Sequence, residues 1–227
     1  MIGIIPAAGQ ATRIHELPKM LLPVPEGALI DVLIANMRRE PLCWHFYIGT
    51  NRATYGFLRQ RTQLHAWVNK AETQTMSETV LLAREHVASD EPVIMGMPDT
   101  YMDDTDAFRK LGDAIRDGAD IAVALFTPRP DQRNGGMCTV SGNQVSSVID
   151  KPTSGDYPYI WGALAWNAAF WEYLNADEPH VGYALPRAIE AGLDVRAVVC
   201  EGGYWDCGTV DGYFALVRQL TREAVLP

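Results

Sequence analysis

Short apolar segments that alternate with helix-length segments are the feature that most constrains the fold of this 227-residue chain. The strand-length segments are rich in β-branched and aromatic residues and cover residues 2–5, 44–48, 64–68, 93–97, 121–126 and 195–199. Helices are expected at residues 29–39, 76–87 and 104–116. This succession predicts a three-layer, Rossmann-like α/β fold, in which helices cover both faces of a mostly parallel sheet.

After about residue 128 the pattern changes. Residues 129–136 are rich in Pro, Asp, Asn and Gly, which is typical of a loop. Two strand-length segments, 137–140 and 144–149, then flank Ser-Gly-Asn and predict a hairpin. We therefore expect a small antiparallel addition in the C-terminal half of the sheet.

Two of the expected helices carry an apolar stripe. In the helix at 76–87 the stripe is Met76, Val80, Ala83 and Val87. In a last helix at 210–220, Val210, Phe214, Val217 and Leu220 share one face, and Thr209 is the expected N-cap.

The overall charge and the cysteines narrow the class of protein. Asp and Glu number 28 against 19 Lys and Arg, giving a net charge of −9, which argues against a nucleic-acid partner but allows a small anionic ligand in a locally basic pocket. No segment is long and apolar enough for a membrane span, and the N-terminus does not resemble a signal peptide. The four cysteines are scattered, as expected for reduced thiols in a cytoplasmic protein. The five histidines lack the spacing of zinc ligands.

The first strand runs directly into a stretch of small residues and two cations. Ala7, Ala8, Gly9, Gln10, Ala11 and Thr12 come before Arg13, and Lys19 follows after Leu17 and Pro18. Small residues here let backbone N–H groups converge on a phosphate, and Arg13 and Lys19 add fixed positive charge. A tight turn with two surface cations is the alternative. Neither the P-loop pattern nor the dinucleotide-binding pattern is present.

The pattern A-A-G-x-x-T-R followed by P-K-x-L-L-P-V resembles the signature loop of the sugar nucleotidyltransferases, also called NDP-sugar pyrophosphorylases. Ala11 stands where many members of that family have Gly. The resemblance implies that Ala7 to Arg13 and Lys19 bind the nucleotide, with Arg13 and Lys19 also catalytic.

A second block is Met97-Pro98-Asp99-Thr100, at the end of an expected strand. An Asp in such a place can be a turn or cap residue, but its hard oxygens also suit Mg²⁺. The resemblance implies that Asp99 is the first metal-binding aspartate and contacts the nucleotide, with Pro98 in place of the usual Gly. The neighbouring Asp103 and Asp104 are expected to be solvated or to cap the next helix.

Two further blocks lie in the C-terminal half. Asp150-Lys151-Pro152 is similar to the E-K-P of the family, with Asp for Glu, which implies that Lys151 binds the phosphate of the acceptor. The same resemblance places Asp150 and Gly162 near the sugar. The segment at 203–209 resembles W-x-D-x-G-T and makes Asp206 the second metal-binding aspartate, opposite a core Trp205.

The loop at residues 70–76 corresponds to the segment that contacts the nucleobase in the family. Thr75 stands in place of the usual Gly, whose backbone contacts the base. The identity of the base stays open, because the side chains on its hydrogen-bonding edge decide it.

Together the four blocks imply one compact domain, residues 1–227, with a nucleotide-binding part at about 1–128 and an acceptor-binding part at about 129–227. The expected activity is Mg²⁺-assisted transfer of a nucleotidyl group from a nucleoside triphosphate to a sugar 1-phosphate, with release of pyrophosphate. Catalysis is assigned to Arg13, Lys19, Asp99 and Asp206. The oligomeric state stays open.

Three alternatives accompany this hypothesis. Aromatic residues in the C-terminal half would suit a phosphocholine cytidylyltransferase-like enzyme. The departures at Ala11, Pro98, Asp150 and Thr75 would suit a catalytically silent regulatory subunit. A glycosyltransferase would also use a strand-end Asp with a metal, but it would not need the spacing from Arg13 to Lys19.

Overall fold

The computed structural model describes residues 1–9, 18–60, 66–130, 132 and 135–225, with side chains up to residue 222. The strands are β1 (Ile2–Ala7), β2 (Pro23–Val24), β3 (Gly27–Ala28), β4 (His45–Thr50), β5 (Ala66–Lys70), β6 (Val93–Gly96), β7 (Thr100–Met102), β8 (Ile121–Phe126), β9 (Gly136–Ser141), β10 (Gln144–Asp150), β11 (Tyr159–Trp166), β12 (Val195–Val199) and β13 (Tyr204–Asp206). The α-helices are α1 (Leu29–Met37), α2 (Arg52–Arg59), α3 (Met76–Leu82), α4 (Ala107–Arg116), α5 (Leu185–Glu190) and α6 (Val210–Val225). Short 3₁₀ helices are η2 (Lys19–Leu21), η4 (Ala83–His86), η5 (Ala168–Tyr173) and η6 (Val181–Ala184).

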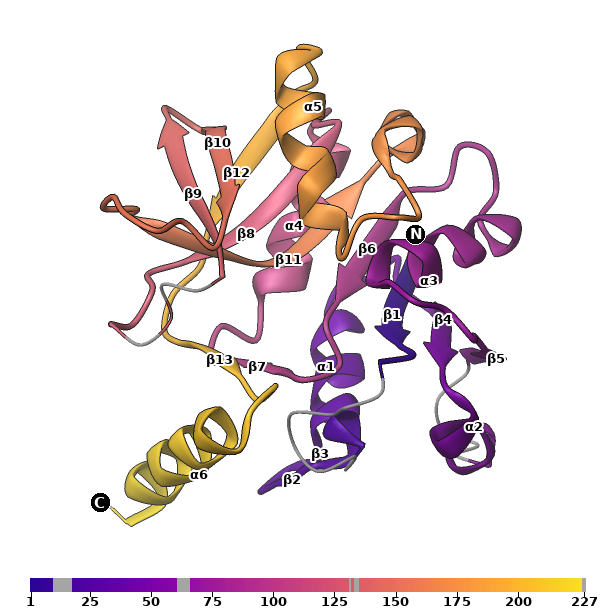
Figure 1. Cartoon of the computed structure of the whole chain (residues 1–227), viewed down its shortest axis with the longest axis vertical. Helices are drawn as coiled ribbons and strands as arrows, with labels where there is room; N and C mark the ends of the chain where they lie inside the picture. The colour runs from indigo at the N-terminus through magenta and orange to yellow at the C-terminus, as the bar shows by residue number, and fades with distance from the viewer. Residues whose placement is uncertain (10–17, 61–65, 131, 133–134, 226–227) are drawn as a thin grey trace.

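A mixed sheet in the order β5-β4-β1-β6-β11-β8-β12-β10-β9 forms the middle layer (Figure 1). Strands β5, β4, β1 and β6 are mutually parallel, as are β8 and β12. The predicted fold class is therefore confirmed, and so is the hairpin of β9 and β10. Strand β11 is antiparallel to both β6 and β8, which places an antiparallel strand in the middle of the sheet as well as at its end.

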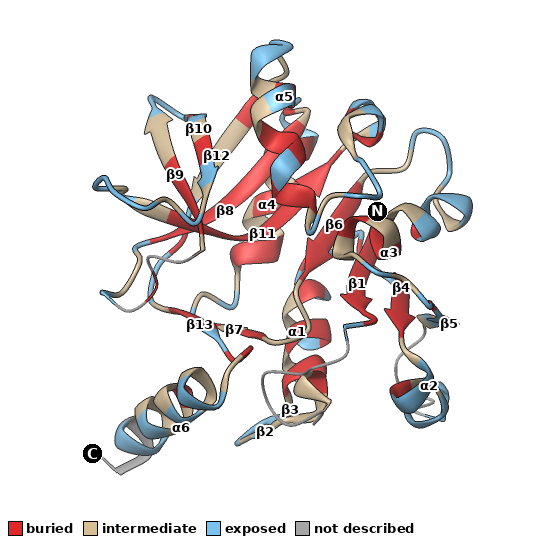
Figure 2. Ribbon diagram, in the orientation of Figure 1, coloured by how far each residue is buried: buried red, intermediate tan, exposed pale blue. Residues whose placement is uncertain are grey.

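Two hydrophobic cores lie on opposite faces of the sheet, and the burial map shows the strands and the inner sides of the helices in red (Figure 2). Helices α1 and α4 pack on one face through residues such as Ile30 and Phe108. Helices α3 and α5 pack on the other through Val80 and Leu185. The stripe predicted for residues 76–87 is confirmed, although its last turn is the 3₁₀ helix η4.

The last helix differs from its prediction. Thr209 accepts a hydrogen bond from the N–H of Gly212, as expected of an N-cap. However, Val210 and Phe214 are 40% and 51% exposed, and the fully buried side chain is Leu216. Helix α6 carries two apolar stripes, and the contacts of Leu216 with the neighbourhood of β13 select the other one. The predicted burial of Val210 and Phe214 was wrong.

The four cysteines are free and buried, and burial raises the pKa of each thiol to about 12. The thiols are therefore protonated at neutral pH, and no disulfide forms among the described residues.

Candidate active site

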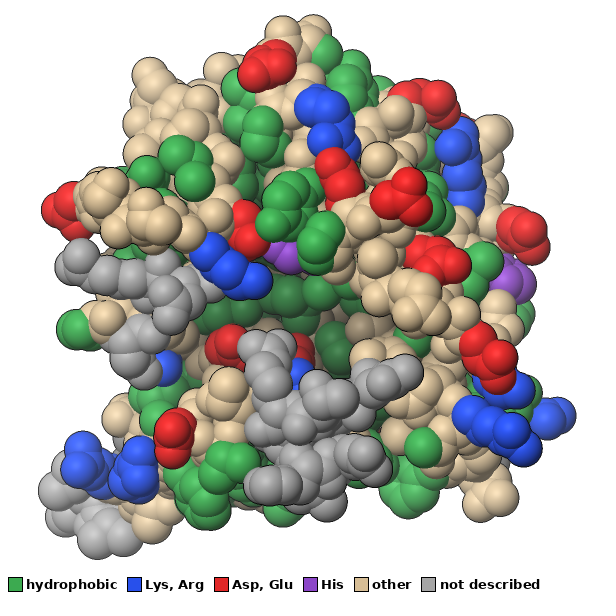
Figure 3. Space-filling view, in the orientation of Figure 1, with side chains coloured by type: hydrophobic (Ala, Val, Ile, Leu, Met, Phe, Trp, Pro, Cys, Tyr) green, Lys and Arg blue, Asp and Glu red, His purple; other side chains and the backbone are tan. Residues whose placement is uncertain are grey.

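The carboxyl end of β1 opens into a cleft of about 560 Å³. Its walls come from the turn after β1, from η2, from the starts of α2 and α3, and from the residues after β6; they include Ala7, Ala8, Gly9, Lys19, Asn51, Arg52, Thr75 and Asp99. Figure 3 shows a hollow near the middle of this face, with acidic and basic side chains on its floor. The expected nucleotide contacts Gln10, Ala11, Thr12 and Arg13 lie outside the described residues.

Three charged side chains meet beside this cleft. The Lys19 ammonium lies 3.1 Å from the Asp99 carboxylate. A methyl group built on Gly208 would lie 2.7 Å from Asp206 Oδ1, 3.3 Å from Asp99 Oδ2 and 3.4 Å from Lys19 Nζ. The ladder between β7 and β13 and a 2.8 Å bond from the Cys207 N–H to the Asp99 carbonyl hold the two acidic residues side by side. Residues 19, 99 and 206 thus converge although they are far apart in the sequence.

The strand that carries Asp206 is fixed by the acidic pair before α4. Asp103 accepts hydrogen bonds from the Gly203 N–H at 2.7 Å and from the Trp205 indole at 3.0 Å. Its neighbour Asp104 pairs with Lys110 at 2.6 Å. The expectation that Asp103 is solvated or capping was therefore wrong, since it anchors β13.

Trp205 is buried, and Asp206 lies on the exposed side of the strand, as predicted for this dipeptide. On the other side of the indole, the Arg129 guanidinium lies 4.1 Å from the ring centre. Arg129 also donates a 2.7 Å hydrogen bond to the carbonyl of Tyr204. These contacts make β13 a rigid support for the second acidic residue.

The expected base-contacting loop forms the far wall of the cleft. Thr75 is the N-cap of α3, and its hydroxyl accepts the Glu78 N–H at 2.9 Å while donating to the carbonyl of Ala176. Its side chain is therefore used within the protein, which leaves the backbone of this loop to face the cleft.

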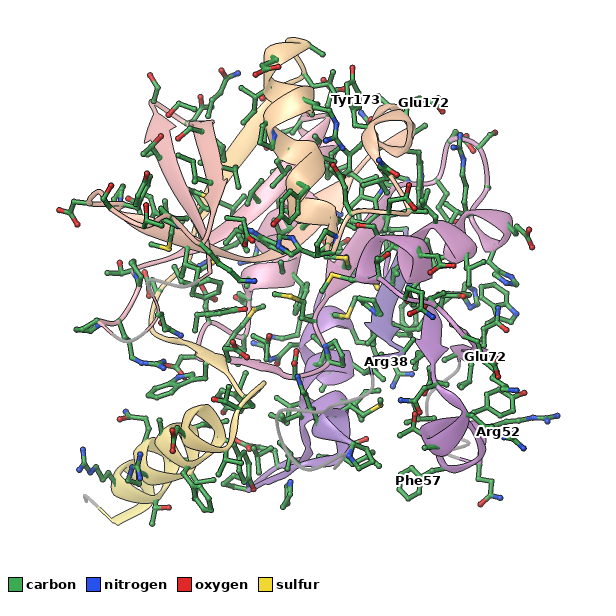
Figure 4. All side chains as sticks on the ribbon, in the orientation of Figure 1. Arg38, Arg52, Phe57, Glu72, Glu172 and Tyr173 are labelled. Carbon is green, nitrogen blue, oxygen red and sulfur yellow. The ribbon has the colours of Figure 1, made fainter. Side chains whose placement is uncertain are left out.

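The start of α2 contributes side chains that the sequence reasoning missed. Asn51 caps α2 and also donates a 3.0 Å hydrogen bond to the carbonyl of Gly9 in the turn after β1. Arg52 lies on the same side of the molecule as Glu72 (Figure 4). The hydrogen bond from Lys70, with a smaller effect of Arg52, lowers the pKa of the Glu72 carboxyl. The signal for these residues was their place after β4, because parallel strands present ligand-binding side chains at their carboxyl ends.

The residues expected on the acceptor side lie elsewhere on the same edge of the sheet. Both oxygens of Asp150 are engaged, one by His180 at 3.1 Å and one by the Tyr183 hydroxyl at 2.9 Å. Lys151 is mostly exposed, and its ammonium lies 3.9 Å from Asp150. Gly162 is buried where a methyl group would come within 2.8 Å of the Phe126 and Tyr204 rings, so packing alone requires glycine there.

The chemistry of Asp99 and Asp206 fits a magnesium ion. Mg²⁺ binds through one or two carboxylates and takes its other ligands from water and phosphate oxygens. Two carboxylates around one point match that requirement. Within the described ranges there is no group of three or more His, Cys, Asp or Glu side chains arranged for a metal ion.

A search for membrane-spanning helices among the described residues finds none with the length and apolar character that a bilayer requires.

The sequence of the chain matches the family of MobA-like NTP transferase domains over residues 3–190. Among curated proteins no significant sequence match was found.

Solved structures share the whole fold. A Bacillus anthracis protein assigned as a glucose-1-phosphate thymidylyltransferase, solved in complex with sucrose, is 15% identical, with a TM-score of 0.81 and coverage of 97% of this chain and 95% of that chain. A UDP-glucose pyrophosphorylase complexed with UDP-glucose is 16% identical, with a TM-score of 0.80 and 98% coverage of both chains. UTP-bound UDP-glucose pyrophosphorylase from Acinetobacter baumannii is 18% identical, with a TM-score of 0.76 and coverage of 98% and 93%. At such identities the likeness establishes the fold.

The fold and the family match together define a nucleotidyltransferase domain, in agreement with the resemblance to sugar nucleotidyltransferases. The chain belongs to the MobA-like NTP transferase family.

Proposed function

We propose that the protein transfers a nucleotidyl group from a nucleoside triphosphate to a sugar 1-phosphate, giving an NDP-sugar and pyrophosphate. The convergence of Lys19, Asp99 and Asp206 beside the cleft carries this proposal. It supplies two carboxylates and a cation at one edge of the cavity into which the turn after β1 opens.

The reaction needs charge neutralisation and alignment more than covalent catalysis. A phosphate oxygen of the acceptor attacks the α-phosphorus, the bond to the bridging oxygen breaks, and pyrophosphate departs with the electron pair. Lys19 neutralises charge that develops on the transferred group, and Arg13 is proposed to do the same for pyrophosphate. Mg²⁺ held by Asp99 and Asp206 would act as a Lewis acid on the α-phosphate.

The turn after β1 is proposed to cradle the triphosphate through the backbone from Ala7 to Thr12. A methyl group on Gly9 would meet no described atom within 4 Å, so internal packing does not require glycine at this position. A need for close approach by a ligand explains the small residue. The base would lie against the backbone at Thr75, beside Asn51 and Arg52.

On the acceptor side, Lys151 is proposed to bind the phosphate, with Asp150 and Gly162 shaping the sugar site. The division at about residue 128 into nucleotide and acceptor parts remains part of this proposal. A sugar phosphate is favoured by the structural neighbours, which include complexes with UTP and UDP-glucose.

A phosphocholine acceptor is less favoured, because it would need exposed aromatic rings around a quaternary ammonium. Trp161, Trp166, Trp171 and Trp205 are all at most 8% exposed and belong to the hydrophobic cores. A silent subunit is also less favoured, because Lys19, Asp99 and Asp206 all remain in place.

Pyrophosphate release tests the proposal. The protein, with Mg²⁺, is incubated with each of four nucleoside triphosphates and with sugar 1-phosphates, phosphocholine or no acceptor. Release that depends on a sugar 1-phosphate supports the proposed reaction, and release that depends only on phosphocholine would replace the acceptor class. Absence of release with every pair would favour the silent subunit, and transfer of a sugar from an NDP-sugar would favour a glycosyltransferase.

A further inference from the structure

The Asp150 carboxylate is held entirely from within the protein. Tyr183 donates to Oδ2 at 2.9 Å, and His180 Nε2 lies 3.1 Å from Oδ1. The Asp150 side chain is 13% exposed. A carboxylate that recognises two sugar hydroxyls would present its oxygens to the acceptor, whereas here both oxygens bind residues at the start of η6.

The next residue has an unusual backbone. Lys151 has a φ of +46°, and it is the one non-glycine residue with positive φ in the part of the chain that the structure describes. L-residues with large side chains adopt this conformation rarely, and they keep it only where the surroundings impose it. The Lys151 N–H donates a 3.0 Å hydrogen bond to the carbonyl of Gly135, which fixes the residue from the side of β9.

The donors to Asp150 sit in a close-packed cluster. The His180 ring lies 4.7 Å from the Tyr183 ring and 5.9 Å from Trp161, measured between centroids. Glycine at position 182 allows this approach, since a methyl group there would lie 2.9 Å from the Trp161 ring and 3.0 Å from His180 Nδ1. Gly136, the partner of Asp150 in the β9–β10 ladder, packs directly on the Trp161 indole nitrogen.

The segment that carries His180 also contacts the nucleotide side of the cleft. The Met76 N–H at the start of α3 donates a 3.1 Å hydrogen bond to the carbonyl of Pro179, and the Thr75 hydroxyl donates to the carbonyl of Ala176. The position of His180 is therefore fixed from the helix that borders the cleft, not by Asp150 alone.

We propose that His180 and Tyr183 are positioning residues for acceptor binding, which hold Asp150 so that the backbone of Lys151 keeps its left-handed conformation and directs the ammonium to the acceptor phosphate. Asp150 then acts through Lys151 and does not contact the acceptor itself. This inference rests on the proposed function for the role of Lys151, but the conformational part stands independently.

The test compares Tyr183→Phe, His180→Leu and His180→Gln with the wild type. Gln places an N–H donor near the position of His180 Nε2, whereas Leu does not, and Tyr183 is partly exposed, so that Tyr183→Phe keeps its fold. Loss of one hydrogen bond to a charged group corresponds to about a tenfold change. We therefore expect Tyr183→Phe and His180→Leu to raise the acceptor KM about tenfold and to leave the nucleotide KM unchanged, with His180→Gln restoring most of the loss.

Tyr213→Phe is the matched control. It also removes a tyrosine hydroxyl that donates a hydrogen bond, in this case to the carbonyl of Pro23 in β2, and it should change neither KM.

A second readout is independent of turnover. The Cα and Cβ chemical shifts of Lys151 in isotopically labelled protein report its left-handed conformation, and they should move toward ordinary values in Tyr183→Phe and His180→Leu. Unchanged shifts in both variants would overturn the proposal, even if the acceptor KM rises, because the two side chains would then contact the acceptor directly. A lower acceptor KM in Tyr183→Phe would also overturn it, since a freed Asp150 oxygen would be binding the acceptor. If the wild type transfers no nucleotidyl group, the proposed function fails, and the Lys151 shifts still decide the positioning role.

Discussion

Asp99 and Asp150 both follow strands of the central sheet, yet the protein surrounds their carboxylates differently. Asp99 pairs with one cation and lies beside Asp206, at the edge of an open cleft. Asp150 binds His180 and Tyr183 and faces the interior of its own half. Two like-charged acids kept together are poised for a cation or a phosphate-bound metal, whereas an acid satisfied by two internal donors supports backbone geometry. Changes on the first side should therefore affect turnover, and changes on the second should affect conformation and acceptor affinity.

The largest expected effect on the nucleotide side is that of metal removal. Under the proposed function, a chelator should reduce pyrophosphate release to background, and added Mg²⁺ should restore it, because Asp99 and Asp206 bind the ion only together with the triphosphate. Full turnover in excess chelator would mean that this acidic pair has another purpose.

Substitution of the charged residues comes next. Lys19→Ala or Asp99→Ala should lower kcat by about 10²–10³-fold while the circular dichroism spectrum stays that of the folded protein. Arg84→Ala, which breaks an exposed ion pair with Glu172, is the control and should leave kcat unchanged. Equal activity in Lys19→Ala and Arg84→Ala would remove the distinction between the cleft and the outer surface.

On the acceptor side, Gly162 tests whether packing dominates. Gly162→Ala should lower the free energy of unfolding by about 1–3 kcal/mol, because the added methyl meets the Phe126 and Tyr204 rings. Gly56→Ala in α2, where a methyl meets no described atom within 4 Å, should instead be neutral or raise it by up to about 1 kcal/mol. Denaturant unfolding measures both, and equal values would show that the site around Gly162 adapts freely.

The smallest effect is expected away from both sides, at the exposed stripe of α6. Phe214→Ser should change the free energy of unfolding by less than about 0.5 kcal/mol, because Phe214 is 51% exposed. Leu216→Ala, two residues further along, should lower it by about 2–5 kcal/mol, since Leu216 is completely buried. A large loss in Phe214→Ser would show that the stripe is covered in solution.

The sequence predicted those parts of the fold whose signal is local. The strands at 121–126 and 195–199 have the predicted bounds, because each is a continuous apolar segment between polar ends. The helix expected at 104–116 starts at Ala107 instead, since Asp104 uses its carboxylate on the N–H groups of Asp106 and Glu201. Strand β11 went unrecognised, although residues 159–166 are almost all apolar, because such a segment gives no sign of its direction in the sheet.

Motif spacing alone named Lys19, Asp99 and Asp206 as partners, because glycines, acids and cations that serve one ligand recur in a fixed order along chains of this type. Tertiary structure decided which of the remaining side chains are bound internally. The engagement of Asp150 by His180 and Tyr183, the anchoring of β13 by Asp103 and the choice of Leu216 in α6 all depend on contacts between segments distant in sequence. Hydrogen bonds and burial at such distances depend on the three-dimensional arrangement of whole elements, and the order of residues carries no local signal for them.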